Sequence, residues 1–325
     1  MVATTKHDLA LEPLSTNLLN QMSNPEHVYQ ELAQVFALRG NQVLEIEIIP
    51  SSLGSFLHDG NALGISKKTL VAAYTVARQL FKQQHDDLSN ATEIMLLFDC
   101  EHLTACNWRK RRLAAVMETE PESEELQAEL TLMTSYQCSP LHRHSKSPTL
   151  WHHRLWLVRH ILRARSWTPA ELLGVLSTEL DAVLRAGELH PRNYYAFSHM
   201  RQVSILLAEM DVFWDPPMLD RVVDWCLAHP RDISGWSFAV YVLDSSTQQY
   251  QLSALEKVAG FALGVGWEGE SLWTFIAQAA SQFNLGDSLL GMLVPRGKET
   301  DNVPVNAGSW SMWLELARAY WTQDG

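Results

Sequence analysis

Apolar residues recur at helical spacing along most of the chain. One apolar face is defined by residues at i, i+4, i+7 and i+11, namely Trp151, Leu155, Val158 and Leu162. Leu150, Leu157 and Ile161 lie on a second face of the same predicted helix. A helix that is apolar on two faces is expected to pack between neighbouring helices rather than on a surface.

An aromatic residue, replaced by cysteine in the first segment, opens each of these helical stretches and repeats along the sequence. The anchor positions are Cys106, Trp151, Phe197, Trp236, Trp273 and Trp310, separated by 45, 46, 39, 37 and 37 residues by subtraction. A second pattern keeps the same register: His190-Pro-Arg-Asn and His229-Pro-Arg-Asp each begin seven residues before an anchor. Two features with one period predict a series of two-helix hairpins.

Local signals place the ends of several elements. Thr168-Pro169-Ala170-Glu171 is a capping box with proline in the first turn, and Asp215-Pro216 predicts another helix start. Residues 45–50 alternate like a short strand, residues 70–81 form a lead-in helix, and residues 138–147 and 295–308 are predicted loops. We therefore expect a non-repeat extension at 1–66 and a repeat region at 67–325.

Composition restricts the classes of function. The formal net charge of −12 leaves no broad basic surface, which argues against nucleic acid as a main partner. No apolar run approaches the ~20 residues needed for a membrane span, so none is expected. The four cysteines form neither a CxxC pair nor a disulfide pattern, which favours a cytoplasmic protein. Tryptophan, with 12 copies, outnumbers phenylalanine with 10, an unusual composition that indicates a repeated structural use of this residue.

The anchor segments resemble the α-subunit repeat of protein prenyltransferases, roughly Asn-Tyr-x-Ala-Trp-x-His-Arg. The third segment, from Asn193 to His199, keeps most of this pattern, and Trp151-His152-His153-Arg154 keeps its core. The first, beginning at Cys106, keeps an asparagine and an arginine, whereas the later segments keep only the aromatic anchor. Together with the element ending at Pro50, these motifs look most like the branch of prenyltransferase α-subunit repeat-containing proteins.

The resemblance implies an all-α fold, a right-handed α-α solenoid of about six helical hairpins. It also implies an α-type subunit of a heterodimeric protein geranylgeranyltransferase, inactive alone, that wraps a β subunit like that of Rab geranylgeranyltransferase. In such an enzyme, prenyl diphosphate binds at the subunit boundary, and an acceptor protein supplies the cysteine. No cofactor is expected in this chain, and zinc is expected in the β subunit.

The resemblance assigns two residues to the reaction. Relatives have a lysine at the position of Arg192, which leans toward the prenyl diphosphate, and a tyrosine at Tyr194 beside the same pocket. An arginine keeps the positive charge and adds a planar fork suited to phosphate oxygens. The alternative is a solvated arginine with a purely structural place in the repeat.

Nine further residues form the repeat motif and are candidates for the partner interface: Asn107, Arg109, Trp151, His152, His153, Arg154, Asn193, His199 and Trp236. The tryptophans are interpreted as packing residues, because a large ring at a fixed position packs one hairpin onto the next. Arg109 and Arg154 either tie helices together through carboxylate pairs or present donors to the β subunit.

Other functions are weighed against this one. His152 and His153 are adjacent, so their side chains point about 100° apart on a helix and no metal site is predicted there. A scaffold that uses the repeats to bind a different partner stays open. A self-contained hydrolase is not supported, since the sequence shows no complete acid-base or metal constellation.

Overall fold

The computed structural model describes residues 24–84, 88–120, 122–141, 143–293 and 309–321. It is mostly helical and divides into two compact units, residues 1–142 and 143–325. The predicted domain boundary at residue 66 falls inside the first unit, between a strand and a helix, and stays a prediction about where the repeats begin.

The first unit combines helices with a small sheet. Its helices are α2 (Pro25–Leu38), α3 (Lys67–Lys82), α4 (Ser89–Phe98), α5 (Leu103–Thr119) and α6 (Glu124–Gln137). Its strands are β1 (Glu45–Ile49), β2 (Phe56–Asp59) and β3 (Ala62–Ser66), with the short 3-10 helix η1 (Ser51–Leu53) between the first two. The predicted strand at 45–50 and the predicted helix at 70–81 are both confirmed.

The sheet corrects the all-α expectation. Its order is β1-β3-β2, with β1 parallel and β2 antiparallel to β3. β2 and β3 are joined by the two residues Gly60 and Asn61, and Gly60 has a φ of 59° that glycine adopts at no steric cost. The sequence Asp59-Gly60-Asn61 is a hairpin signal. It favours a tight turn between two strands here, although most of the chain is helical.

The second unit contains helices that pack in sequence order. They are α7 (Pro148–Ala164), α8 (Pro169–Leu189), α9 (Tyr194–Ala208), α10 (Pro216–Ala228), α11 (Ile233–Asp244), α12 (Gln248–Val265), α13 (Glu270–Gln282), α14 (Gly286–Leu293) and α15 (Ser309–Trp321). The 3-10 helix η2 (His144–Lys146) precedes them within the predicted loop 138–147, of which residue 142 lies outside the described residues.

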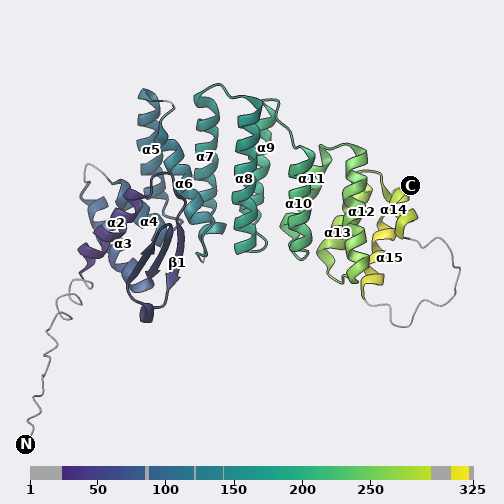
Figure 1. Ribbon diagram of the computed structural model, residues 1–325, viewed down its shortest axis with the longest axis horizontal. Coiled ribbons are helices and arrows are strands. Elements are labelled where there is room, and N and C mark those ends of the chain that lie inside the picture. The colour runs from purple at the N-terminus through teal and green to yellow at the C-terminus, as the bar shows by residue number, and fades with distance from the viewer. Residues whose placement is uncertain (1–23, 85–87, 121, 142, 294–308, 322–325) are drawn as a thin grey trace, which may run out of the picture. The chain divides into compact units, whose positions relative to one another are not determined.

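Within this unit the first helices of the hairpins form one row and the second helices another. In the first row, α7, α9, α11, α13 and α15 each contact the next member, and α10, α12 and α14 do so in the second row. Figure 1 shows the helices from α7 to α13 standing side by side. None of the described helices is both long and apolar enough to cross a membrane.

The predicted helix starts are present. Thr168 caps α8 in a complete capping box with Glu171, and the Asp215 side chain accepts from the Met218 amide at the start of α10. The predicted loop 295–308 lies outside the described residues, as does the side chain of the sixth anchor, Trp310.

The anchor tryptophans are buried and make the same hydrogen bond in three hairpins. The indole nitrogens of Trp151, Trp236 and Trp273 donate to the carbonyl oxygen six residues earlier, at 2.8, 3.0 and 2.8 Å. Their rings fill the core, and their N–H groups hold the loop that leads into each first helix. This bond explains why tryptophan is used at these anchors, since no other apolar side chain carries a ring N–H.

Candidate functional site

The motif arginine of the first segment lies in the core of the first unit. Arg109 on α5 donates through Nε to Glu129 on α6 at 2.8 Å, and its Nη2 also pairs with that carboxylate. Nη1 donates to Thr92 on α4 at 2.9 Å, and Nη2 reaches Glu93 at 3.3 Å. Burial alone would lower the pKa of Arg109, but the Glu129 carboxylate outweighs burial and raises that pKa.

The equivalent arginine of the second segment forms a matching network in the second unit. Arg154 on α7 makes two hydrogen bonds of 2.8 Å to Glu179 on α8, through Nε and Nη2. Glu179 also receives His199 Nε2 from α9 at 2.6 Å. All three side chains are buried, so this triad ties three helices of two consecutive hairpins together.

Ionisation in the triad follows from burial and charge. Burial alone would raise the pKa of Glu179, but the Arg154 charge and the His199 hydrogen bond lower it to about 2. Burial lowers the pKa of His199, only partly opposed by the Glu179 carboxylate. His199 is therefore neutral near pH 7, and its Nε2–H donates to an ionised glutamate.

Most of the motif residues that are candidates for a partner interface are buried in this chain. Seven of the nine motif residues are buried: Arg109, Trp151, His153, Arg154, Asn193, His199 and Trp236. These side chains are enclosed by neighbouring helices, which favours the inter-repeat alternative, and their place at a partner interface stays a prediction. Only Asn107 and His152 are exposed, and both follow an anchor directly.

Asn193 has a defined structural task. Its Oδ1 accepts from the Ala196 amide at 3.2 Å and caps α9, while its Nδ2 donates to the Ser145 carbonyl at 2.6 Å. The same carbonyl receives the Trp151 indole. One loop oxygen thus joins the second and third anchor segments.

The two residues assigned to the reaction lie at the surface. Arg192 and Tyr194 are both exposed, the tyrosine by 67%. Arg192 has a φ of 61°, a left-handed conformation that is unusual outside glycine, asparagine and aspartate. Its amide donates to Asp232 Oδ2 at 2.6 Å, and Asp232 also caps α11. The backbone of Arg192 therefore has a structural role, whereas its guanidinium lies at the surface.

The loops before three consecutive first helices each place a cation directly ahead of the capping residue. These residues are Lys146 before Ser147, Arg192 before Asn193 and Arg231 before Asp232, and all three are exposed. Lys146 Nζ donates to the Pro191 carbonyl at 2.8 Å, and Arg192 N bonds Asp232, so the three loops are neighbours. We call Lys146, Arg192 and Arg231 the cationic edge. The resemblance pointed to Arg192 alone, although the His-Pro-Arg repeat also contains Arg231.

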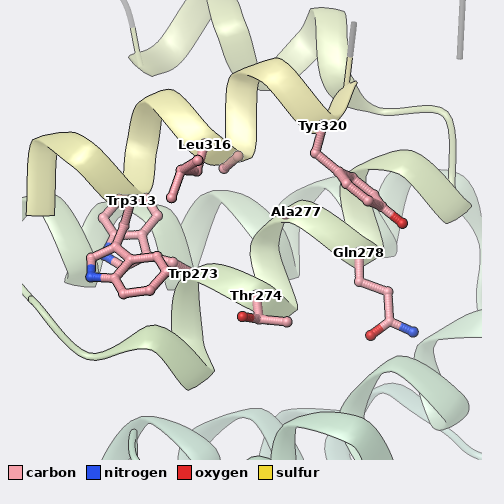
Figure 2. Close-up of a pocket in the computed structure, with 8 residues that line it drawn as sticks. Trp273, Thr274, Ala277, Gln278, Trp313, Leu316 and Tyr320 are labelled. Carbon is pink, nitrogen blue, oxygen red and sulfur yellow. The ribbon is translucent and has the colours of Figure 1, made fainter. Parts of the chain in front are cut away.

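One cavity lies beside motif residues, and another lies near the C-terminal end of the second unit. A small cavity of about 30 Å³ between α7 and α9 brings Trp151, His152 and His199 together with Tyr195. A larger one of about 370 Å³ lies between α13 and α15 (Figure 2). Trp313, Leu316 and Tyr320 of α15 face Thr274 and Gln278 of α13 across it. Its lining has no charged side chain, so it suits an uncharged apolar group rather than a diphosphate.

The adjacent histidines His152 and His153, where no metal site was predicted, lie in different environments. His152 is exposed, whereas His153 is buried and stacks on Trp156 with ring centroids 5.8 Å apart. Among the described residues, no group of three or more His, Cys, Asp or Glu side chains is placed to hold a metal ion.

These features define a mostly helical protein whose hairpins repeat a buried anchor and, in two cases, a buried Arg–Glu pair. The chain is similar to human protein prenyltransferase alpha subunit repeat-containing protein 1, with 26% identity over 176 residues. The match covers 50% of this chain and 41% of the human protein. A family model described as the ECM9 middle domain matches residues 155–260, from within α7 to within α12. The resemblance predicted from the anchor motifs is confirmed as a distant similarity.

Proposed function

We propose that this chain is the α-type subunit of a heterodimeric protein prenyltransferase that transfers a geranylgeranyl group to a protein cysteine. In this proposal its hairpins form a right-handed solenoid of about six repeats around a β subunit resembling that of Rab geranylgeranyltransferase. The similarity to a protein named for prenyltransferase α-subunit repeats supports the choice of class.

The observation that carries the proposal is the cationic edge. The N-terminal end of a helix already bears partial positive charge, so a cation there is unfavourable unless an anion is nearby. Here three consecutive first helices have such a cation, and the Asp232 carboxylate that lies among them is buried and accepts from three backbone amides. A prenyl diphosphate carries the multiple negative charge that would stabilise this arrangement.

In this proposal the two subunits contribute different parts of the active site. The β subunit would supply the apolar lipid pocket and a zinc ion, which lowers the pKa of the acceptor thiol. This chain would place the Arg192 guanidinium at the diphosphate, where negative charge grows as the carbon–oxygen bond breaks. Tyr194, two residues further along at the first position of α9 and exposed, would border that site.

The test replaces Arg192 in the assembled heterodimer. Arg192→Asn is the informative variant, because asparagine tolerates the left-handed backbone and leaves the amide bond to Asp232 in place. Single-turnover transfer from radiolabelled geranylgeranyl diphosphate should slow by roughly 10–10³-fold, the range for losing one preorganised donor. Arg192→Lys should retain most of the rate.

Arg231→Ala is the matched control for a surface cation one hairpin further along the cationic edge. It should change the single-turnover rate less than Arg192→Asn does. Unchanged rates in both Arg192→Asn and Arg192→Lys, with an intact heterodimer on gel filtration, would show that the guanidinium has no part in the reaction.

A scaffold without transferase activity is the second candidate. The burial of Arg109, Arg154 and His199 favours it, because the motif residues that are kept most fully have a sufficient structural explanation. A pull-down from the native cell separates the two candidates. Recovery of a prenyltransferase β subunit supports the enzyme, and a reproducible partner of another class without that subunit supports the scaffold.

A further inference from the structure

The two edge strands of the three-stranded sheet differ in whether side chains satisfy their outward backbone groups. Two hydroxyls cover part of the β1 edge: the Leu44 amide donates to Ser135 on α6 at 2.9 Å, and the Ile46 amide donates to Ser139, just after α6, at 2.8 Å. Ser139 also donates to the Leu44 carbonyl at 3.2 Å. These side chains satisfy backbone groups that an edge strand otherwise leaves available for pairing.

The β2 edge has no such cover among the residues that the structure describes. Because Asp59 and Ala62 flank the two-residue turn, alternate residues of β2 bond to β3, and Phe56 and His58 present their N–H and C=O groups outward. The bond from Ser66 N to the Ser55 carbonyl at 3.0 Å fixes this alternation. β2 also contains neither proline nor lysine, two residues that commonly protect an edge.

One face of the sheet carries negative charge up to this edge. The strand register aligns Glu47 with Gly64 and Leu57 across the sheet, and Glu45 with Ala62 and Asp59. The three carboxylate residues are exposed, and Leu57 is 51% exposed. Gly64 adds no side chain between Glu47 and Leu57, and the Ile49 side chain packs over it instead. A strand added beside β2 would place alternate side chains next to Leu57 and Asp59.

We propose that the β2 edge binds an extended basic segment of another protein as a fourth strand. The outward groups of Phe56 and His58 form its main-chain hydrogen bonds, Leu57 contacts an apolar side chain, and the carboxylates select lysine or arginine. A second copy of β2 is a poorer occupant, because a two-fold pairing brings a second set of carboxylates onto the same face. This site is independent of the proposed transferase function.

The experiment uses the full chain and a fluorescein-labelled seven-residue peptide of alternating valine and lysine. Fluorescence anisotropy at low ionic strength should show saturable binding that weakens with added salt. His58→Pro removes one outward N–H but no ladder bond, and it should weaken binding about tenfold or more. His58→Ala keeps the backbone donor and should bind within about twofold of the wild type.

Two further arms identify the recognition chemistry. A peptide of alternating valine and glutamate should bind at least about tenfold more weakly, and Glu45→Gln with Glu47→Gln should reduce that difference. If His58→Pro lowers the melting temperature, a lysine peptide with methylated backbone nitrogens replaces the His58→Pro measurement. This peptide lacks the N–H donors for main-chain pairing and should not bind. Absence of saturable binding, equal binding of the methylated peptide, or equal binding of the two charge types would overturn the proposal. A concentration-dependent dimer that His58→Pro abolishes would assign the edge to a second copy and would equally overturn it.

Discussion

At the residue scale, the chain uses its repeat arginines as internal ties. Arg109 and Arg154 occupy equivalent positions three residues after an anchor, and each meets a glutamate on the following helix. The carboxylate and guanidinium are both buried and satisfy one another, so each depends on its partner. The sequence offered two alternatives for these arginines, and their burial favours the tie.

Breaking the Arg154 pair should be strongly destabilising. Arg154→Met leaves the Glu179 carboxylate buried without its main counter-charge, and such a loss typically costs about 3–5 kcal/mol. Urea unfolding followed by circular dichroism would measure it. Arg185→Ala, which removes an exposed pair with Glu188, is the control and should cost less than about 1 kcal/mol. Equal effects of the two variants would contradict the assigned role of the triad.

The triad also predicts how stability depends on pH. The pKa of His199 lies below 6.5 in the folded state, so the unfolded state binds its proton first as pH falls. The free energy of unfolding should therefore decline as pH falls below about 6.5. Glu179, with a folded pKa of about 2 against 4.5 unfolded, adds a second decline as pH falls below about 4.5.

The variant His199→Gln separates these two contributions. Glutamine can still donate to Glu179 but does not titrate, so the decline that begins near pH 6.5 should shrink while the acid decline remains. Denaturant unfolding at a series of pH values would measure both. An unchanged slope between pH 6.5 and 5 in the variant would show that His199 is not the titrating group.

At the element scale, close helix packing depends on two glycines that face one tryptophan. A Cβ atom on Gly187 of α8 would lie 2.9 Å from the ring of Trp225 on α10, and one on Gly235 of α11 would lie 2.5 Å from it. Real Cβ atoms do not approach this closely. The flat Trp225 ring therefore sets the spacing of these helices, and glycine is required at both positions by the close approach.

A pair of glycine variants tests this packing. Gly235→Ala should destabilise the protein by about 1–3 kcal/mol, because overpacking outweighs the helix propensity gained. Gly174→Ala in α8 has open space around its new methyl group and should stabilise by up to about 1 kcal/mol. Thermal unfolding of both variants gives the comparison. Stabilisation by both would mean that Trp225 moves aside without cost.

At the scale of the whole molecule, the proposed partner gives the strongest expectation. A permanent heterodimer commonly buries at least ~2,000 Å². Because the β subunit would bind the folded chain and not the unfolded one, its coexpression should raise the melting temperature of this chain. Differential scanning calorimetry of the chain alone and of the purified complex would measure the change. Equal melting temperatures with every candidate β subunit would favour the scaffold.

The repeat period, several helix starts and one strand could be predicted because they depend on near neighbours in the chain. The capping box at Thr168 needs only a residue three positions later, and the anchor period needs only counting. The strands β2 and β3 were missed although Asp59-Gly60-Asn61 signals their turn, because each is short and its apolar alternation is weak. The anchor indole bond was missed because its acceptor is a backbone carbonyl, which leaves no mark in the sequence.

The sequence by itself determined that this protein is mostly helical, that its hairpins repeat, and that it resembles prenyltransferase α-subunit repeats. Only the tertiary structure decided where the motif side chains go. Glu179, 25 residues from Arg154, could be recognised as its partner only once α7 and α8 were placed. The same holds for the left-handed backbone of Arg192 and the uncovered edge of β2. Local rules fix which residues form an element, whereas burial and pairing depend on contacts between residues far apart in the chain.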